Sequence, residues 1–149
     1  MNQLESLKAT GALRVVLTDE NGVVKEDVNL KNLVVNTGLN YIVSRMKDTT
    51  DTAMSHMALG TGTTSAAANN TALETAISGG RVSLTSTTVS TNTITYVASF
   101  PAGTGTGAVT ESGIFNASSG GTMLCRTVFP VVNKQSGDSM TVTWTVTVS

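Results

Sequence analysis

Residues 140–149 alternate strictly between threonine and apolar side chains. The apolar set is Val142, Trp144, Val146 and Val148, and the threonine set is Thr141, Thr143, Thr145 and Thr147. Because successive side chains of a β-strand point to opposite faces of a sheet, this period of two predicts a strand with one buried and one exposed face. Threonine suits the exposed face, since it is polar and β-branched. The pattern indicates antiparallel sheets with one solvated side.

The same alternation recurs along most of the chain and predicts further short strands. They lie at residues 12–18, 23–30, 55–59, 81–89, 93–100, 113–116 and 122–129. Among their apolar residues, Val82 and Leu84 are expected to be buried, and Ile94, Tyr96, Ala98 and Phe100 to share one face.

Turn-forming residues separate several of these strands. The pair Asn21-Gly22 favours positive φ angles and predicts a hairpin between the first two strands. Residues 90–92 predict a tight connection, and residues 118–121 and the pair Gly137-Asp138 predict further turns.

Four apolar residues recur at helical spacing and predict one helix. They are Leu39, Ile42, Val43 and Met46. Asn36 or Thr37 can accept hydrogen bonds from the first free backbone N–H groups, and the helix is expected to end near Lys47 or Asp48. A further helical turn is predicted over residues 70–77.

The chain of 149 residues has the length of one domain. Roughly seven to nine short strands with closely spaced turns predict an all-β fold with one short helix, an antiparallel β-sandwich of jelly-roll-like type. This single domain is expected to span residues 11–149. Residues 1–10 are expected to form an N-terminal arm that contacts a neighbouring subunit, since Leu4 and Leu7 are too few to pack a core of their own.

Composition excludes several classes of function. Charged residues make up only 13% of the chain and the net charge is −1, which argues against binding to nucleic acid. One cysteine and one histidine provide neither a disulfide framework nor a zinc site. The first residues lack the pattern of a signal peptide, and no apolar run approaches the about 20 residues that cross a bilayer.

Two low-complexity stretches, residues 60–68 and 102–107, contain Gly-Thr-Gly. Backbone N–H groups in such loops can bind an anion, and this raises the possibility of a phosphate site. The stretches lack the Gly-Lys-Ser/Thr of a Walker loop, and no amphipathic helix follows the first of them. They are therefore interpreted as flexible surface loops between strands.

Few residues are candidates for chemistry. His56 has no acidic neighbour in sequence, and Cys125 lies in a strand where a free thiol ordinarily behaves as a small buried apolar group. Glu111 begins an apolar strand and is expected to pair with Arg81 or Arg126 as a surface salt bridge. Trp144 and Phe129 are expected in the core. We therefore predict no catalytic, cofactor-binding or metal-binding residues and no enzymatic activity.

Several segments, taken together and in order, resemble small β-rich virion proteins of tailed bacteriophages. They are residues 32–39 (NLVVNTGL), 57–62 (MALGTG), 109–116 (VTESGIFN), 121–126 (GTMLCR) and 140–146 (MTVTWTV). Related domains occur in head decoration proteins and in tail-fibre or collar proteins. The resemblance spans roughly residues 30–148, and it carries over no catalytic residues because that family is structural.

The resemblance implies a protein of the virion, made in the host cytoplasm. It also implies homo-oligomers, with a trimer expected, and contacts with the major capsid protein or with tail and collar proteins. Because the last strand ends at the last residue, no distal receptor-binding region is expected, which favours a stand-alone capsid decoration or cement protein. A tail, collar, baseplate or short-fibre component is the alternative, as is a module that binds the host surface through its Gly/Thr loops.

Overall fold

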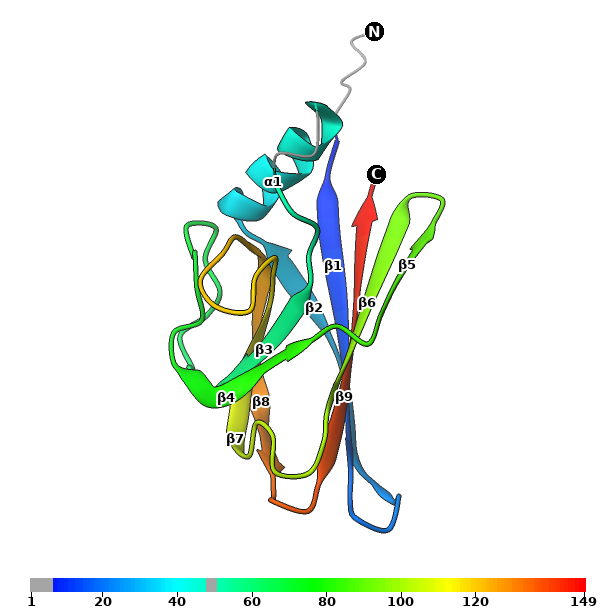
Figure 1. Ribbon diagram of the computed structural model, residues 1–149, viewed down its shortest axis with the longest axis vertical. Helices are drawn as coiled ribbons and strands as arrows, with labels where there is room; N and C mark the ends of the chain where they lie inside the picture. The colour runs from blue at the N-terminus through cyan, green and yellow to red at the C-terminus, as the bar shows by residue number, and fades with distance from the viewer. Residues whose placement is uncertain (1–6, 48–50) are drawn as a thin grey trace, which may run out of the picture.

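The computed structural model describes residues 7–47 and 51–149, which form antiparallel strands and one helix (Figure 1). The elements are β1 (Ala9–Thr18), β2 (Val24–Val34), α1 (Asn36–Lys47), β3 (His56–Gly60), β4 (Ala76–Ser83), β5 (Ser86–Ser90), β6 (Thr93–Phe100), β7 (Gly107–Phe115), β8 (Met123–Lys134) and β9 (Ser139–Val148). Within the described residues the nine strands form one curled sheet in the order β4-β3-β7-β8-β2-β1-β9-β6-β5. The predicted β-rich class with one short helix is confirmed.

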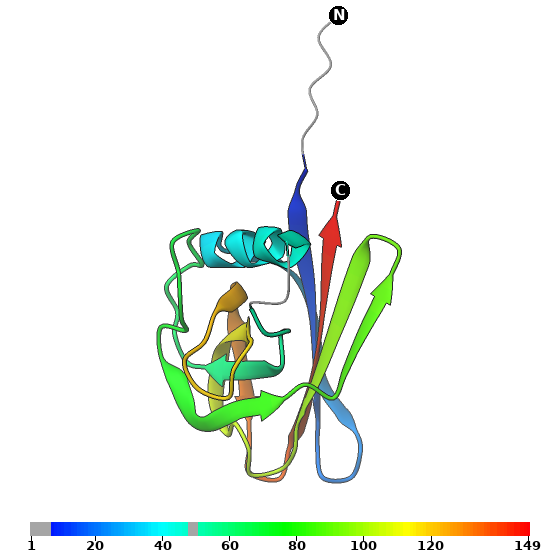
Figure 2. The ribbon, with the colours of Figure 1, turned by 45° about the horizontal axis from the view of Figure 1, so that its top comes forward.

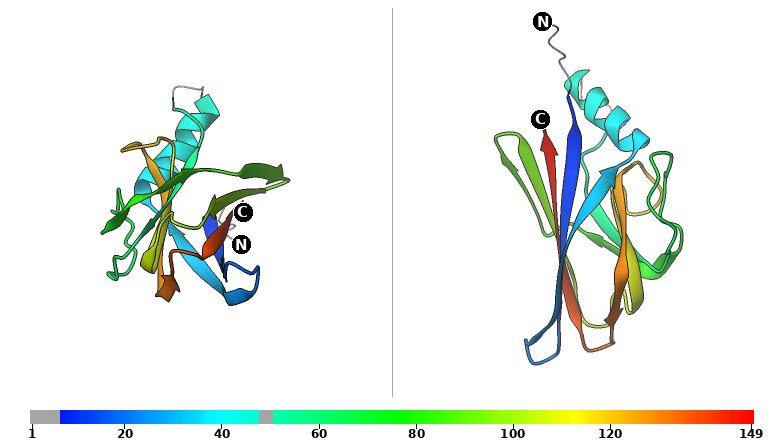
Figure 3. Two further views of the ribbon diagram at one scale, coloured as in Figure 1. Left: turned by 60° about the horizontal axis from the view of Figure 1, so that its bottom comes forward. Right: turned by 180° about the vertical axis from the view of Figure 1, so that it is seen from behind.

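The sheet bends at β2. This strand pairs with β1 along most of its length, but with β8 only through Leu33 and Val34. Two halves therefore diverge from it: a β9 half, with β1, β9, β6 and β5, and a β7 half, with β8, β7, β3 and β4 (Figure 3). Helix α1 lies near the end of the sheet where β1 begins and β9 ends (Figure 2).

The hydrophobic core fills the space between the two halves. Its members from the β9 half include Leu13, Val15, Phe100, Val142 and Trp144, and those from the β7 half include Met57, Leu59, Ile114, Leu124 and Phe129. The expected core positions of Trp144 and Phe129 are confirmed. In β9 the apolar residues from Val142 to Val146 are buried and the threonines between them are more exposed, as the alternation predicts.

The hairpin between β1 and β2 forms at the predicted turn. Gly22 has a φ of 82°, a conformation that side chains other than glycine disfavour. The Asp19 carboxylate accepts hydrogen bonds from the backbone N–H groups of Asn21 and Val23, both at 2.9 Å. Both strands extend beyond their predicted bounds. Ala9 and Thr10 of the predicted arm already belong to β1, whereas Leu7 and Lys8 precede the strand and residues 1–6 lie outside the described residues.

The predicted strand at residues 81–89 is wrong, because the chain changes partners within it. β4 pairs with β3 and β5 pairs with β6, which places them at opposite ends of the sheet. The backbone N–H of Leu84 bonds to Ser55 and that of Thr85 bonds to Val97, so two residues connect the two halves. Alternation persists through such a crossing, and for that reason it does not reveal the change of partner.

The predicted helix forms, but its orientation differs from the expectation. Leu39, Val43 and Met46, which the helical spacing placed on a buried face, are exposed. The helix instead rests on β8 through its first turn, where Thr37 donates a hydrogen bond to the carbonyl of Met123. A side chain at Gly38 would lie 2.0 Å from the carbonyl oxygen of Leu124, so this close approach requires glycine.

The helical turn predicted over residues 70–77 does not form. This segment bends irregularly before β4 begins at Ala76. Two of its N–H groups, those of Glu74 and Thr75, bond to the carboxylate of Glu111, which removes them from helical hydrogen bonding. Among the described residues, no helix is long and apolar enough to cross a membrane.

Candidate functional site

Two regions of the molecule are candidates for a functional site: a buried polar network and an apolar groove. The first is the loop of residues 61–75, which packs over Glu111 of β7 and Arg126 of β8. The two side chains form an ion pair at 2.8 Å, and their exposed fractions are 0% and 2%. The expected pairing of Glu111 is therefore confirmed for Arg126, whereas the expectation of a surface salt bridge is wrong.

The Glu111 carboxylate is surrounded by backbone donors from the 61–75 loop. Its Oε1 accepts hydrogen bonds from the N–H groups of Gly62 at 3.1 Å and Thr75 at 2.7 Å, and its Oε2 accepts one from Glu74 at 3.0 Å. A Cβ at Gly60 or Gly62 would lie 2.4 Å or 2.6 Å from Oε1. Both glycines are therefore needed for the carboxylate to come this close to the backbone.

Arg126 completes the network. Its Nη1 donates to Asn70 Oδ1 at 3.0 Å and its Nη2 donates to the carbonyl of Thr64 at 3.1 Å. A buried ion pair gains from such additional bonds, because they offset the loss of hydration of both charges. The network ties the 61–75 loop to β7 and β8. The hydrogen-bond acceptors of the Glu111 carboxylate are therefore occupied by groups of the same chain.

Glu74 adds a bond within the same loop. Its Oε1 accepts hydrogen bonds from the N–H groups of Thr63 and Thr64, at 3.0 and 3.4 Å. Hydrogen bonds from the Thr64 side chain and from these amides lower the pKa of Glu74. The N–H groups of this Gly-Thr-Gly loop thus bind a carboxylate of the same chain.

The second Gly/Thr stretch, residues 102–107, forms tight turns. Gly103, Gly105 and Gly107 all have positive φ angles, and the N–H of Thr104 bonds to the carbonyl of Pro101. A side chain at Gly105 would lie 2.8 Å from Leu59. These glycines therefore serve the geometry of the connection between β6 and β7.

The two remaining candidates from the sequence are His56 and Cys125. The Nδ1 of His56 lies 2.7 Å from the hydroxyl of Ser55, and its Nε2 lies 3.5 Å from that of Ser83. Cys125 is fully buried, and burial raises the pKa of its thiol well above the usual value, which suppresses the reactive thiolate. No group of three or more metal-binding side chains occurs within residues 7–47 and 51–149.

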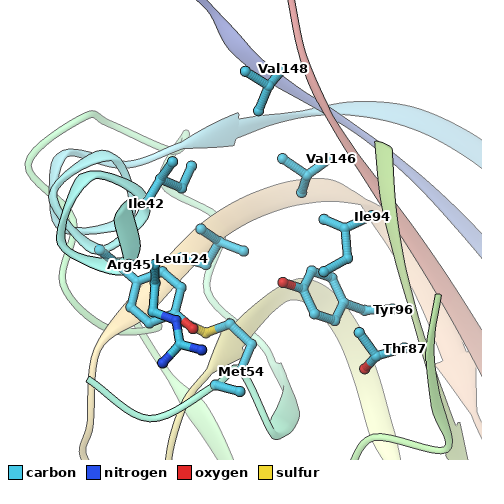
Figure 4. Close-up of a pocket in the computed structure, with 11 residues that line it drawn as sticks. Ile42, Arg45, Met54, Thr87, Ile94, Tyr96, Leu124, Val146 and Val148 are labelled. Carbon is cyan, nitrogen blue, oxygen red and sulfur yellow. The ribbon is translucent and has the colours of Figure 1, made fainter. Parts of the chain in front are cut away.

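The second region is an open apolar groove at the end of the sheet near α1 (Figure 4). It has a volume of about 330 Å³ and lies between α1, the segment before β3 and the β9 half. Its lining consists of Tyr41, Ile42, Arg45, Ala53, Met54, Thr87, Ile94, Tyr96, Leu124, Val146 and Val148. Most of these side chains are apolar, so the groove can bind apolar groups by removing them from water.

Tyr96 provides a polar group inside the groove. Its side chain is almost fully buried, with 5% exposed, and its hydroxyl points into the groove (Figure 4). Burial raises the pKa of this hydroxyl well above the usual value, and among the described residues no hydrogen bond contributes to that shift. The hydroxyl is therefore available to a hydrogen-bonding group that enters the groove.

Uncharged surface surrounds this groove on its β5 side. From residue 82 to residue 110 the chain contains no charged side chain, and this stretch includes all of β5 and β6. Sequence reasoning predicted Tyr96 as a face residue of its strand but did not predict the groove. The uncharged stretch of residues 82–110 was the sequence signal for this region, because uncharged surface has a small desolvation penalty on binding.

Comparison of the chain with protein-family models, with curated proteins and with solved structures finds no match. The geometry of the two regions, together with the sequence resemblance, therefore forms the basis for a functional proposal.

Proposed function

We propose that this chain is a structural protein of a tailed-bacteriophage virion, and specifically a stand-alone decoration or cement protein that stabilises the head through subunit contacts. The phage context comes from the resemblance of residues 32–39, 57–62, 109–116, 121–126 and 140–146. In this proposal the curled sheet acts as a two-layer, jelly-roll-like sandwich. The partners are the major capsid protein and further copies of the chain, with a homotrimer as the expected assembly.

The observation that carries the proposal is the surface around the groove. The apolar groove is open to solvent, and Thr87 of the uncharged, fully exposed edge strand β5 contributes to its lining. Leu39, Val43 and Met46 of α1 expose further apolar surface. Exposed apolar surface of this kind is typical of protein–protein contact. The polar groups elsewhere, Glu111 and Arg126 above all, are occupied with each other and with the backbone, which supports a mechanical role without catalysis or a cofactor.

The location of the protein in the particle tests this proposal. Quantitative mass spectrometry of purified virions should find hundreds of copies, and electron cryomicroscopy should place the protein on the head beside the major capsid protein. A dozen copies or fewer would reject the decoration role and point to the alternative, a tail, collar, baseplate or short-fibre component. Absence of the chain from purified particles would reject a virion role altogether.

A second candidate function, recognition of the host surface, is favoured by the order of the 61–75 loop. Its exposed side chains, such as Thr63, Ser65 and Asn69, are held in place by the network beneath them. Preorganised loops bind with less loss of conformational entropy. Replacing these three residues together by alanine should then abolish phage adsorption while leaving particle assembly intact, and normal adsorption would reject the idea.

A further inference from the structure

Among residues 7–47 and 51–149, no strand pairs with the outer side of the edge strand β5. All five of its residues are exposed, and its pairing partner is β6, with continuous register from Ser86 opposite Val97 to Ser90 opposite Thr93. On the other side, an edge strand presents backbone N–H and C=O groups that can pair with another strand. The structure thus offers an unpaired edge beside the apolar groove, to which Thr87 contributes.

The opposite edge of the sheet, β4, differs in the features that block pairing. Its register with β3 shifts between Ala58 and Gly60, and Gly79 has a φ of 72°. The guanidinium of Arg81 bonds to the carbonyls of Ala117 and Gly120. Bulges, glycines and charged side chains are the usual means by which proteins protect an edge strand. β5 has none of them: its sequence is Ser-Thr-Thr-Val-Ser, without lysine or proline.

Charge decides which partner such an edge fits. In a two-fold antiparallel pairing the same strand of each copy forms the contact, so a charge at or near the axis lies opposite or diagonally across from an identical charge. The absence of charged residues from residue 82 to residue 110 removes this repulsion along the whole β5–β6 hairpin. The β5 edge is therefore electrostatically compatible with itself, whereas β4, which contains Arg81, is not.

We propose that β5 pairs antiparallel with β5 of a second copy of this chain. A two-fold axis at Thr88 gives every residue of β5 a partner, with Thr87 opposite Val89 of the second copy. Val89 and Thr87 pair with Ile94 and Tyr96 of β6, so they lie on the groove side of the sheet. The contact would place the second copy's Val89 beside Thr87 at the groove and cover an apolar side chain that is 71% exposed in the single chain.

Cysteine cross-linking tests the contact at its centre. Directly opposed residues in an antiparallel pair have Cα atoms about 4.5–5.5 Å apart, which lies within the range of a disulfide, about 4.4–6.8 Å. Because the native Cys125 is fully buried, Thr88→Cys introduces the accessible thiol. Mild oxidation should convert most of the T88C protein to a covalent dimer. The matched control is S78C, on the exposed part of β4, which should remain largely uncross-linked; equal cross-linking of the two variants would overturn the proposal.

A second measurement does not depend on oxidation. Light scattering of the purified protein should show that Val89→Lys lowers the mass of the assembly two-fold. The lysines of the two copies would lie diagonally across the contact, about 7–8 Å apart, and repel each other. Val23→Lys, at a similarly exposed position near the β1–β2 turn, should leave the mass unchanged. An assembly of the same mass in wild type and V89K would overturn the contact.

This pairing goes beyond the proposed function, because it does not require a virion. It forms dimers about a two-fold axis, and this contact is separate from any contact that builds a trimer. Its tests use the purified chain, whereas the proposed function is tested by copy number in particles. Failure of one therefore leaves the other standing.

Discussion

At the β4 end of the sheet, charged groups are buried and bonded to each other and to a loop, whereas at the β5 end uncharged and apolar groups remain open to solvent. Glu111 and Arg126 together form hydrogen bonds with five groups of the 61–75 loop. Among these groups are the backbone N–H groups of Gly62 and Thr75. Tyr96, beside β5, is 5% exposed, and its hydroxyl points into the open groove, with no hydrogen bond from the described residues among the causes of its raised pKa. The first end is complete in a single chain, and the second has the features of a surface that another molecule completes.

Removing the cation from the buried pair should have the largest effect. Arg126→Met leaves the Glu111 carboxylate buried without its partner, which typically costs about 3–5 kcal/mol of the free energy of unfolding. Urea unfolding of the purified variant measures the loss. Arg14→Met breaks a pair with Asp27 that lies at the surface, and because solvent screens that pair, its loss should be much smaller. Similar losses in the two variants would contradict the difference between buried and exposed pairs.

Crowding the same network should have an intermediate effect. Gly62→Ala places a Cβ 2.6 Å from both Glu111 Oε1 and the Cβ of Glu74, and such overpacking typically costs about 1–3 kcal/mol. Thermal unfolding, with hydrogen exchange of the Gly62 and Thr75 amides, reports both the stability and the order of the loop. The neighbouring exposed change Thr63→Ala should alter neither. A fully stable G62A with protected amides would show that the loop adapts without the glycine.

At the other end, removing a polar group should cost nothing. Tyr96→Phe deletes a hydroxyl whose raised pKa includes no hydrogen bond from the described residues among its causes, so the free energy of unfolding should stay within about 0.5 kcal/mol or rise. Tyr41→Phe is the matched control, because the backbone of Met54 lies close enough to the Tyr41 hydroxyl to lower its pKa. Its loss should be about 0.5–1.5 kcal/mol. A clear loss in Y96F would show that the hydroxyl is already bonded in the free chain.

The smallest effect concerns pH. Hydrogen bonds lower the pKa of Glu74 in the folded state, so this carboxylate contributes stability above its unfolded pKa of about 4.3. That contribution is lost as the pH falls through the folded value. Glu74→Gln should therefore flatten the decline in stability on acidification. Urea unfolding at a series of pH values between neutral and acidic measures this decline, and an unchanged pH profile in E74Q would contradict the role of Glu74.

Alternation along each strand was sufficient to predict the class of fold, because it depends on neighbours within the strand. Val142 and Trp144 are buried as their spacing predicts, and the turn at Gly22 forms where Asn-Gly places it. The split of residues 81–89 into two strands could not be predicted in this way. It depends on hydrogen bonds from Leu84 and Thr85 to residues distant in sequence.

The candidate site was predictable only in part, for the same physical reason. The pairing of Glu111 with Arg126 was one of two expected options, since the sequence shows charges but not which strands adjoin. Burial of that pair depends on the 61–75 loop folding over it, and the spacing of apolar residues predicted a helical turn for residues 70–77 instead. The outward face of Val43 and Met46 follows from how α1 docks on β8, which helical spacing does not specify.

The position of β9 in the sheet has a consequence for synthesis. β9 lies between β1 and β6, and its residues pair with both along nearly their full lengths. When β1 leaves the ribosome, β9 has not yet been translated, so the β1–β2 and β5–β6 pairs are joined into one half of the sheet only after residues 139–148 emerge. Pairing between such distant segments also makes folding slow. Until then the backbone edges of β1 and β6 that β9 covers are open to pairing with other chains.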